Sequence, residues 1–395
     1  TEYLKKIQDG GNIMSYEIDT VCIHGDGHRT EDKNCAISYP IYQTASFSHL
    51  TPGHNPSGFD YSRESNPTRA YLEETVSALE GACDTIAFSS GMAAISAVFE
   101  YFKPGDHIIC GEDLYGGVVR LAAVVMSKKG CQVDFVDTSD LNALKAAVKE
   151  NTRAIYVETP SNPMMLVTDI RAVSQIAKEA GVLLIVDNTF MTPYFQNPLK
   201  LGADVVVHSG TKYLSGHNDT VCGFLCSKEQ KLAEYFRLIS KTTGATLGPF
   251  ECWLCMRGLK TLAVRMERHQ SNAMAIAGWL KSQECVEKVY FTGLEDNPGY
   301  EKNREQARGY SGMISFTVKS AELAQNILKH VKLITFAESL GGTESLLTYP
   351  AVQTHPDVPV EQREKLGITD KLLRLSVGIE DPGDLIADLK QAMER

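Results

Sequence analysis

Between about residues 70 and 230, short apolar segments alternate with longer segments of helical periodicity. In the longer segments apolar residues recur every three or four positions, which is typical of helices with one buried face. The short segments are apolar runs that end in small or turn-forming residues, which is typical of buried strands. The predicted strands are "TIAFSS", "HIICGE", "QVDFVD", "AIYVETP", "VLLIVDN" and "ADVVVH". This alternation predicts a mainly parallel α/β sheet that helices cover on both faces.

The two flanking regions show other patterns. Residues 1–60 are irregular and rich in turn-forming and aromatic residues, so we expect this segment to pack against something else. A long helical region, residues 250–283, leads out of the sheet domain into further strands and helices. These predict a smaller α+β domain, and we divide the chain at 1–60, 61–254 and 255–395. Its predicted strands are "KVYF", "MISFTV", "KLITF" and "LLRLSVGIE", and its predicted helices are "AELAQNILKH" and "DPGDLIADLKQAME".

Composition narrows the classes of partner. The 395 residues are 43% hydrophobic and 22% charged, which is typical of globular proteins, and the net charge of −10 favours neither nucleic acid nor an anionic membrane as partner. We find no signal-like start and no long apolar run, so we expect a cytoplasmic protein with no membrane partner. The ten cysteines are scattered, and the pair Cys252 and Cys255 in "CWLC" lies in an apolar helical pattern. We expect core thiols there and no metal site.

The ends of the predicted strands carry most of the polar residues of interest. Ligands of parallel α/β sheets gather at the carboxyl ends of strands. After "TIAF", the run Ser89-Ser90-Gly91-Met92 opens a helix, and a helix N-terminus suits a phosphate. A plain tight turn is an equally good interpretation of this run alone. The chain has neither GxGxxG nor GxxxxGK[ST], so it carries neither a dinucleotide fingerprint nor a P-loop.

Three further strand ends bear an amide, an acid and a lysine. Asn162 follows "AIYVE", Asp187 follows "VLLIV", and Lys212 follows "ADVVV" with Ser209 and Thr211 beside it. Taken singly, Asp187 can be interpreted as a helix cap, and a surface position is the better interpretation of Lys212. A buried carboxylate, however, needs a cation or several hydrogen bonds.

Together these residues meet the needs of pyridoxal 5'-phosphate. The cofactor requires a lysine that condenses with its aldehyde, an acid that keeps its pyridine nitrogen protonated, a phosphate cradle and an aromatic ring that stacks on it. A desolvated lysine also has a lowered pKa, which makes its amine a better nucleophile. Tyr115, in "GEDLYGG" after the strand "HIIC", is the candidate stacking residue, although a core tyrosine is an equal alternative when it is taken alone.

At this point the sequence resembles the cysteine and methionine metabolism family of fold-type I pyridoxal phosphate enzymes. These are the cystathionine gamma-lyases, beta-lyases and gamma-synthases, with the methionine gamma-lyases. The resemblance extends from about residue 20 to the C-terminus. It rests on "YSRESNPTR", "SSGMAA", "DLYGG", "ETPSNP", "VDNTF", "HSGTKYLSGHND", "AESLGGTESL" and "RLSVGIED", in that order. It implies an aspartate-aminotransferase-like large domain and a smaller C-terminal domain.

The resemblance also implies roles for individual residues. Lys212 matches the lysine that binds the aldehyde, Asp187 the partner of the pyridine nitrogen, and Tyr115 the stacking residue, which can also act as a base. Asn162 matches the residue near the phenolic oxygen of the cofactor. The positions that match phosphate-binding residues are Gly91, Met92, Ser209 and Thr211.

Substrate contacts and assembly follow from the same resemblance. Arg374 matches the arginine that binds the substrate α-carboxylate, Ser339 a further contact to it, and Glu338 an acid suited to the distal ammonium of cystathionine. Tyr61 and Arg63 match residues that reach the site of a neighbouring subunit, where Tyr61 also approaches the substrate. The resemblance therefore implies that the N-terminal segment contributes to the neighbouring subunit, within a homotetramer built as a dimer of dimers.

Some positions depart from the family pattern. Gly117 stands where methionine gamma-lyases typically carry cysteine, which disfavours that activity. Gln353 replaces a more usual methionine, and Gly210 a more usual alanine. Neither change moves an assigned role.

We therefore predict a pyridoxal phosphate-dependent carbon–sulfur lyase. It would act on cystathionine or a related sulfur amino acid by α,γ- or α,β-elimination, giving a thiol, ammonia and a 2-oxo acid. The main alternative is a cystathionine gamma-synthase, which replaces the γ-substituent of an O-acylated homoserine. A methionine gamma-lyase or an O-acetylhomoserine sulfhydrylase is a weaker alternative. In another class, the alternative is a non-catalytic or nucleotide-binding α/β protein in which Lys212 only neutralises a phosphate. The absence of dinucleotide and P-loop motifs disfavours it.

Overall fold

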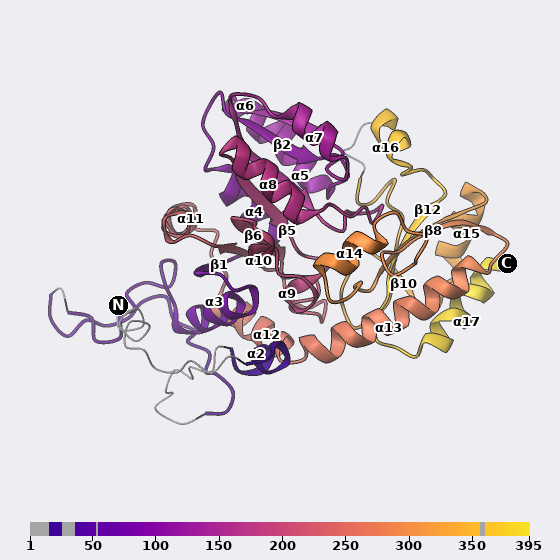
Figure 1. Cartoon of the computed structure of the whole chain (residues 1–395). Helices are drawn as coiled ribbons and strands as arrows, with labels where there is room; N and C mark the ends of the chain where they lie inside the picture. The colour runs from indigo at the N-terminus through magenta and orange to yellow at the C-terminus, as the bar shows by residue number, and fades with distance from the viewer. Residues whose placement is uncertain (1–15, 26–35, 53, 356–359) are drawn as a thin grey trace.

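The structure is a computed structural model that describes residues 16–25, 36–52, 54–355 and 360–395. Within these residues the chain forms a seven-stranded sheet and a five-stranded sheet, which lie at opposite sides of the molecule in Figure 1. Helices α12 (Pro249–Leu259) and α13 (Leu262–Lys281) run from the first sheet to the second. The predicted large α/β domain and smaller second domain are confirmed, while the exact division at residue 254, which falls inside α12, stays a proposal.

The large sheet is mainly parallel, as predicted. Strands β6, β5, β4, β2 and β3 run parallel, whereas β7 is antiparallel to both of its neighbours, β1 and β6. The order is β1 (Asp84–Phe88), β7 (Gly223–Ser227), β6 (Val205–Ser209), β5 (Leu183–Asp187), β4 (Thr152–Glu158), β2 (His107–Gly111), β3 (Gln132–Val136). Strand β7 was not predicted. It returns antiparallel because residues 210–222, which join it to β6, form no crossover helix.

Helices cover both faces of this sheet. On one face pack α3 (Pro67–Glu80), α7 (Leu141–Ala147), α8 (Ile170–Ala180) and α12, through one continuous apolar core. On the other pack α4 (Gly91–Phe99), α5 (Gly116–Arg120), the π-helix η1 (Leu121–Met126) and α11 (Gln230–Thr243). Short helices α6 (Ser127–Lys129), α9 (Thr192–Phe195) and α10 (Pro198–Leu201) complete this part of the chain. The inner strands are therefore buried on both faces, which explains their apolar runs, whereas the edge strand β3 is only partly buried.

The predicted helical region 250–283 is two helices rather than one. The break lies at Lys260 and Thr261, between α12 and α13. Arg265 bridges it by donating to the carbonyl oxygens of Gly258 at 2.8 Å and Tyr213 at 2.7 Å. A Cβ at Gly258 would lie 2.1 Å from the carbonyl oxygen of Ser215, so glycine lets α12 approach the segment that follows β6. Cys252 and Cys255 are buried free thiols in this helix.

The small sheet carries the C-terminal core. Its order is β10 (Thr335–Phe336), β11 (Leu346–Thr348), β12 (Leu372–Ser376), β9 (Met313–Val318), β8 (Val286–Tyr290). The predicted strand "KLITF" shortens to its last two residues, both exposed at the sheet edge, and β11 was not predicted. The helices are α14 (Tyr300–Gln306), α15 (Ala321–His330), α16 (Val360–Leu366) and α17 (Pro382–Met393). Both predicted helices, α15 and α17, are present.

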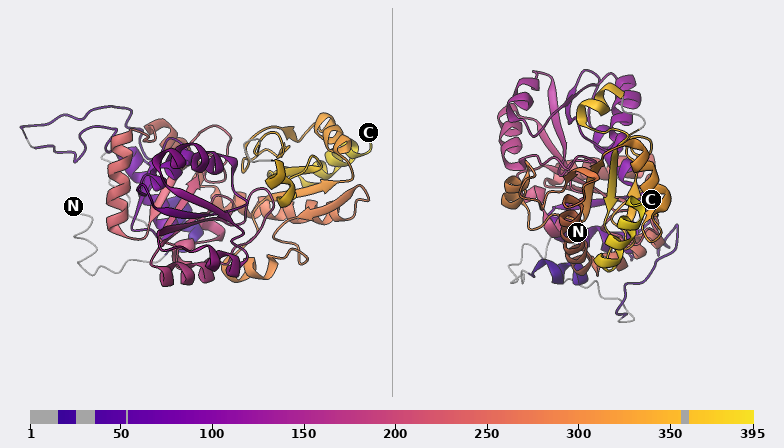
Figure 2. Two further views of the ribbon diagram at one scale, coloured as in Figure 1. Left: turned by 90° about the horizontal axis from the view of Figure 1, so that it is seen from above. Right: turned by 90° about the vertical axis from the view of Figure 1, so that its right-hand side faces the viewer.

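The N-terminal segment is only partly irregular. Helix α2 (Ile18–His24), which was not predicted, lies against α3 with Cys22 buried between them. Residues 36–52 and 54–61 belong to an arm with little regular structure that projects from the body in Figure 2 and exposes apolar side chains such as Ile37 and Leu50. The rest of the predicted segment, 1–15 and 26–35, lies outside the described residues.

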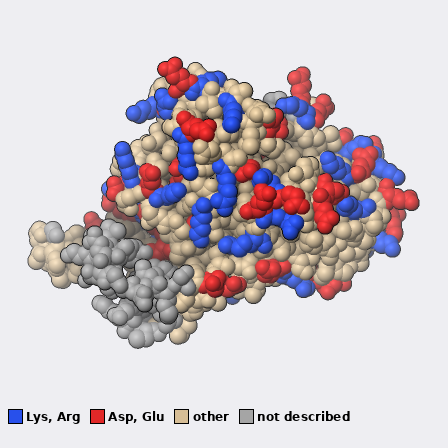
Figure 3. Space-filling view, in the orientation of Figure 1, with Lys and Arg blue, Asp and Glu red and all other residues tan. Residues whose placement is uncertain are grey.

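Surface charge and helix composition add two observations. On the face shown in Figure 3, acidic and basic side chains are interspersed, so this face presents no large region of one sign. Among the residues that the structure describes, no helix combines the length and the apolar character needed to cross a bilayer.

Candidate active site

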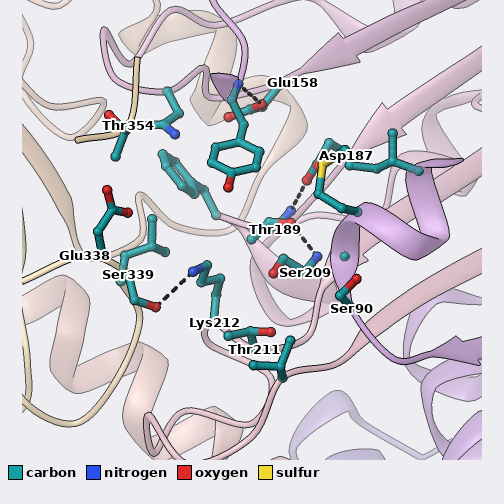
Figure 4. A pocket seen from close by; sticks show the side chains of 18 of the residues that line it. Ser90, Glu158, Asp187, Thr189, Ser209, Thr211, Lys212, Glu338, Ser339 and Thr354 are labelled. Atoms are coloured by element: carbon teal, nitrogen blue, oxygen red, sulfur yellow. Dashed lines mark hydrogen bonds between the residues drawn. The ribbon is translucent and has the colours of Figure 1, made fainter. Parts of the chain in front are cut away.

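A cavity of about 300 Å³ lies where the parallel strands of the large sheet end, and the small sheet closes one side of it. Eleven residues predicted from sequence as site residues line it together: Gly91, Met92, Tyr115, Asn162, Asp187, Ser209, Thr211, Lys212, Glu338, Ser339 and Arg374. They come from seven separate segments of the chain, and Figure 4 shows several of them converging. The topology therefore explains why these residues, distant in sequence, share one space.

Lys212 follows β6 and points its amine into this cavity. Its Nζ donates to Ser339 Oγ at 2.8 Å (Figure 4). Burial lowers the pKa of the Lys212 ammonium to about 8, with a further lowering by the charge of Arg374 and an opposing effect of Glu338. Ser339 has φ +93°, an uncommon conformation for a residue with a side chain, at the point where it meets the lysine. The amine is thus partly neutral near pH 8.

The first turn of α4 forms a cradle for an anion. Ser90 caps the helix by accepting from Ala93 N, and Gly91 and Met92 open it beside the cavity. A Cβ at Gly91 would lie 2.8 Å from Ser209 Cβ, so glycine allows the helix end to meet the segment after β6. The first N–H groups of a helix have no acceptor within the helix and bear its positive dipole end. This arrangement suits a phosphate.

Thr211 also lines the cavity, but its hydroxyl group is engaged elsewhere. It donates to the carbonyl oxygen of Cys222 at 3.2 Å and accepts from Cys222 N at 3.0 Å. These bonds tie the start of β7 to the segment that carries Lys212. Gly210 lies in the same contact between the two segments, because a Cβ at this position would lie 2.4 Å from the Phe224 ring. The glycine at this position, where alanine is more usual, therefore accompanies a bulky neighbour.

Asp187 is a buried acid with two hydrogen-bond donors. It accepts from Thr189 N at 2.9 Å and from Tyr156 OH at 3.3 Å. Burial raises the pKa of Asp187, and the bonds from Thr189 act in the opposite direction. An acid so placed gains from a cationic partner in the cavity.

Arg374 brings a buried cation from β12 of the small sheet. Its guanidinium donates to Asn162 Oδ1 at 2.8 Å, to the carbonyl oxygen of Ser339 at 3.2 Å and to Thr348 Oγ1 at 3.3 Å. Its Nε is buried without a partner among the described residues. Burial lowers the pKa of Arg374 to about 10. Because these three partners are neutral oxygens, the cation suits a carboxylate brought by a ligand.

Tyr115 stands at the N-terminus of α5, and its neighbours are packed closely. Its N–H donates to Glu158 Oε2 at 3.1 Å. A Cβ at Gly116 would lie 2.5 Å from the Thr354 carbonyl oxygen, and one at Gly117 would lie 2.5 Å from the Tyr115 ring. A cysteine at position 117 would therefore have to displace that ring.

Tyr61 and Arg63 are the two predicted site residues that do not line this cavity. They lie at the base of the arm, where the Arg63 guanidinium sits 5.4 Å from the centre of the Tyr61 ring and donates to the Lys241 carbonyl oxygen at 2.5 Å. Tyr61 is 43% exposed. Their assignment to the site of a neighbouring subunit stays a prediction.

Comparison with known proteins bears on this geometry. The model of the family "Cys/Met metabolism PLP-dependent enzyme" matches residues 19–394. The chain belongs to this family. A cystathionine beta-lyase of Lactococcus lactis is 48% identical over 378 residues, covering 96% of this chain and 99% of that protein. A cystathionine gamma-synthase of Haemophilus influenzae is 46% identical over 380 residues, covering 96% and 98%. The crystal structure of a cystathionine gamma-lyase from Lactobacillus plantarum, complexed with L-serine, has a TM-score of 0.93 and 43% identity, covering 96% and 99%.

As a member of the Cys/Met metabolism family, the protein is a pyridoxal phosphate-dependent enzyme of fold type I. The cavity fits this cofactor, because it offers a cradle for a phosphate, an acid for a ring nitrogen and an amine for an aldehyde. The residues that would hold it are Lys212, Asp187, Ser209 and the first turn of α4.

Several residues that line the site of this family member were not predicted. They include Glu158, Thr189 and Thr354, whereas Ser90 was named only as part of the run that opens α4. Glu158 is the last residue of β4, as Asp187 is of β5, so the reasoning that selected Asp187 applies to it as well. No sequence pattern indicated Thr354, because it lies in the loop that follows β11 and not at the end of a predicted strand.

Proposed function

We propose that the protein is a carbon–sulfur lyase that acts on cystathionine or a related sulfur amino acid. The reaction is an α,γ- or α,β-elimination that gives a thiol, ammonia and a 2-oxo acid. The observation that carries the proposal is that Lys212, Arg374 and Glu338 line one cavity. The charges of Arg374 and Glu338 both act on the amine of Lys212. One cationic and one anionic side chain near a basic amine suit an amino acid with a carboxylate at one end and a distal ammonium at the other.

In this proposal each side chain has a distinct task. Pyridoxal phosphate, when bound, supplies an electron sink for negative charge at Cα of the substrate. Arg374 and Asn162 orient the α-carboxylate, and Glu338 binds the distal ammonium. Lys212 removes the proton from Cα, for which a pKa of about 8 is well matched to near-neutral pH. The Tyr115 ring would stack on the cofactor, and its hydroxyl group assists proton transfer to the departing thiol.

The alternative is a cystathionine gamma-synthase, and the similar relative of that name from Haemophilus influenzae supports it. Both activities need a basic group at Cα and a bound carboxylate, so the residues described so far serve either one. Methionine gamma-lyase activity is a weaker candidate, since Gly117 leaves no room for a side chain beside Tyr115. O-Acetylhomoserine sulfhydrylase activity is likewise a weaker candidate.

We also propose a homotetramer built as a dimer of dimers, located in the cytoplasm. The projecting arm, with exposed Ile37 and Leu50, supports an assembly in which the arm is covered by another subunit. Tyr61 and Arg63 at its base would then complete a neighbouring site. Size-exclusion chromatography with light scattering tests this directly, and a monomer with full activity would contradict it.

The test of function is incubation with cystathionine alone, followed by identification of the oxo acid. 2-Oxobutyrate supports γ-elimination, pyruvate supports β-elimination, and negligible turnover supports the synthase. The control is Lys212→Ala, which should lose both turnover and the visible absorption of lysine-bound cofactor. A Lys212→Ala variant that keeps that absorption would overturn the assignment of the lysine.

A further inference from the structure

Glu158 and Asp187 are neighbouring acids at the ends of adjacent strands. The two residues are direct partners in the parallel register of β4 and β5, so their side chains leave the sheet on the same face. Both line the cavity, and each is only 8% exposed. Figure 4 shows them next to each other above the segment that holds Lys212. Two buried carboxyl groups this close do not both ionise readily.

The hydrogen bonds distinguish the two acids. Within the described residues, Asp187 accepts from Thr189 N and Tyr156 OH, whereas Glu158 accepts from Tyr115 N alone. Hydrogen bonds to a carboxylate favour its ionised form, so the better-supplied acid holds the charge. The cofactor site needs that charge at Asp187. This leaves Glu158 as the acid that retains a proton.

Charged groups from three neighbouring segments act on Glu158. Asp187 on β5 and Asp113 after β2 disfavour its ionisation, and Arg374 on β12 favours it. Glu158 also lines a second, small hollow together with Asp113, Glu112 and Asp137, so acids surround it on that side too. Burial is the largest influence and raises the pKa of Glu158 well above its usual value. Binding of a carboxylate at Arg374 would weaken the one opposing influence.

We propose that Glu158 is a positioning residue, held as a neutral carboxylic acid beside ionised Asp187. The carbonyl oxygen of the Glu158 side chain accepts the Tyr115 N–H, and this bond fixes the Tyr115 ring in the cavity. The Tyr115 segment has a second anchor in Asp113, which accepts from Met164 N at 3.1 Å and from the Ser161 hydroxyl group. Two acids thus tie this segment to the end of β4. The inference rests on the cofactor site of the proposed function, but it does not depend on which amino acid is the substrate.

The test compares amides at the two acids. Glu158→Gln keeps an oxygen for the Tyr115 N–H and cannot ionise, so we expect the Kd for pyridoxal phosphate to stay within about threefold of wild type. Asp187→Asn removes the charge that we assign to the site, and we expect its Kd to rise roughly a hundredfold. Glu158→Leu removes the acceptor, and we expect a Kd rise of roughly tenfold together with a shifted cofactor absorption band.

The outcomes separate the alternatives. If Glu158→Gln weakens binding as much as Asp187→Asn does, Glu158 is ionised and the inference is wrong. If Glu158→Leu matches Glu158→Gln, Glu158 only fills space and does not position Tyr115. Because cofactor binding is measured without substrate, failure of this inference is distinguishable from failure to cleave cystathionine.

A second measurement uses the wild-type protein, and the Glu158→Gln variant serves only to assign the band. In wild-type protein labelled with ¹³C-glutamate, infrared spectra at neutral pH should contain a label-sensitive carboxylic acid C=O band. Where Glu158→Gln folds, that band should be absent from it. A wild-type spectrum without such a band would overturn the inference.

Discussion

The low pKa of Lys212 leads to a quantitative prediction about how fast the protein takes up its cofactor. Only the neutral amine attacks an aldehyde, so the rate should follow the neutral fraction of Lys212. With a pKa of about 8 instead of 10.5, the neutral fraction at pH 7 is larger by 10^(10.5 − 8), or roughly 300-fold. We therefore expect the rate of cofactor uptake to rise with pH and to level off above about pH 8.

The assay mixes cofactor-free protein with pyridoxal phosphate over a range of pH and follows the visible absorption band. Free lysine, measured in parallel, corrects for titration of the cofactor itself. Glu338→Gln tests the direction of the shift. The Glu338 carboxylate favours the charged Lys212 amine, so its removal should lower the midpoint pH of cofactor uptake. A midpoint that stays near that of free lysine, or that rises in Glu338→Gln, would refute the reasoning.

Three further changes have expected outcomes of different kinds. Arg374→Lys replaces a forked donor by a single ammonium, so kcat/KM for the amino acid should fall by about 10- to 100-fold with little change in cofactor absorption; an unchanged kcat/KM would contradict the carboxylate assignment. Gly91→Ala places a Cβ 2.8 Å from Ser209 Cβ and should raise the Kd for cofactor roughly tenfold, whereas Gly278→Ala, with open space around it, should leave the Kd unchanged. His269 is buried, and burial lowers its pKa to about 4, below its unfolded value of 6.5. The stabilisation from neutral His269 should be complete above about pH 6.5 and should be lost as the pH falls toward 4. The free energy of unfolding should decrease by at most about 3 kcal/mol over this range. In denaturant titrations, this decrease should be smaller in His269→Gln.

Much of the large sheet could be predicted because its inner strands are buried on both faces. The apolar runs Leu183–Val186 and Val205–Val207 lead directly to Asp187 and to the segment that carries Ser209, so their ends mark the site. Strand β7 was missed because it follows a long irregular segment, and its antiparallel direction depends on pairing that no local pattern records. The two-residue strand β10 is set by its neighbour β11 and not by its own periodicity.

The site was predictable wherever a residue followed a recognisable strand, and not elsewhere. Lys212 and Asp187 belong to the first kind. Thr354 belongs to the second, since only the folded chain brings its loop against Gly116. The engagement of the Thr211 hydroxyl group by Cys222 also depends on how β7 returns, so no spacing in the sequence could indicate it.

The position of Arg374 on the small sheet has a consequence for how such an enzyme could change its specificity. The groups suited to the cofactor belong to the large sheet and the segments that follow its strands, whereas Arg374, Glu338 and Ser339 come from the C-terminal part of the chain. The residues suited to cofactor chemistry and those suited to substrate recognition therefore lie in different parts of the fold. Substitutions around β12 and residues 337–340 could therefore redirect the enzyme to a new sulfur amino acid while the reactive half is inherited unchanged.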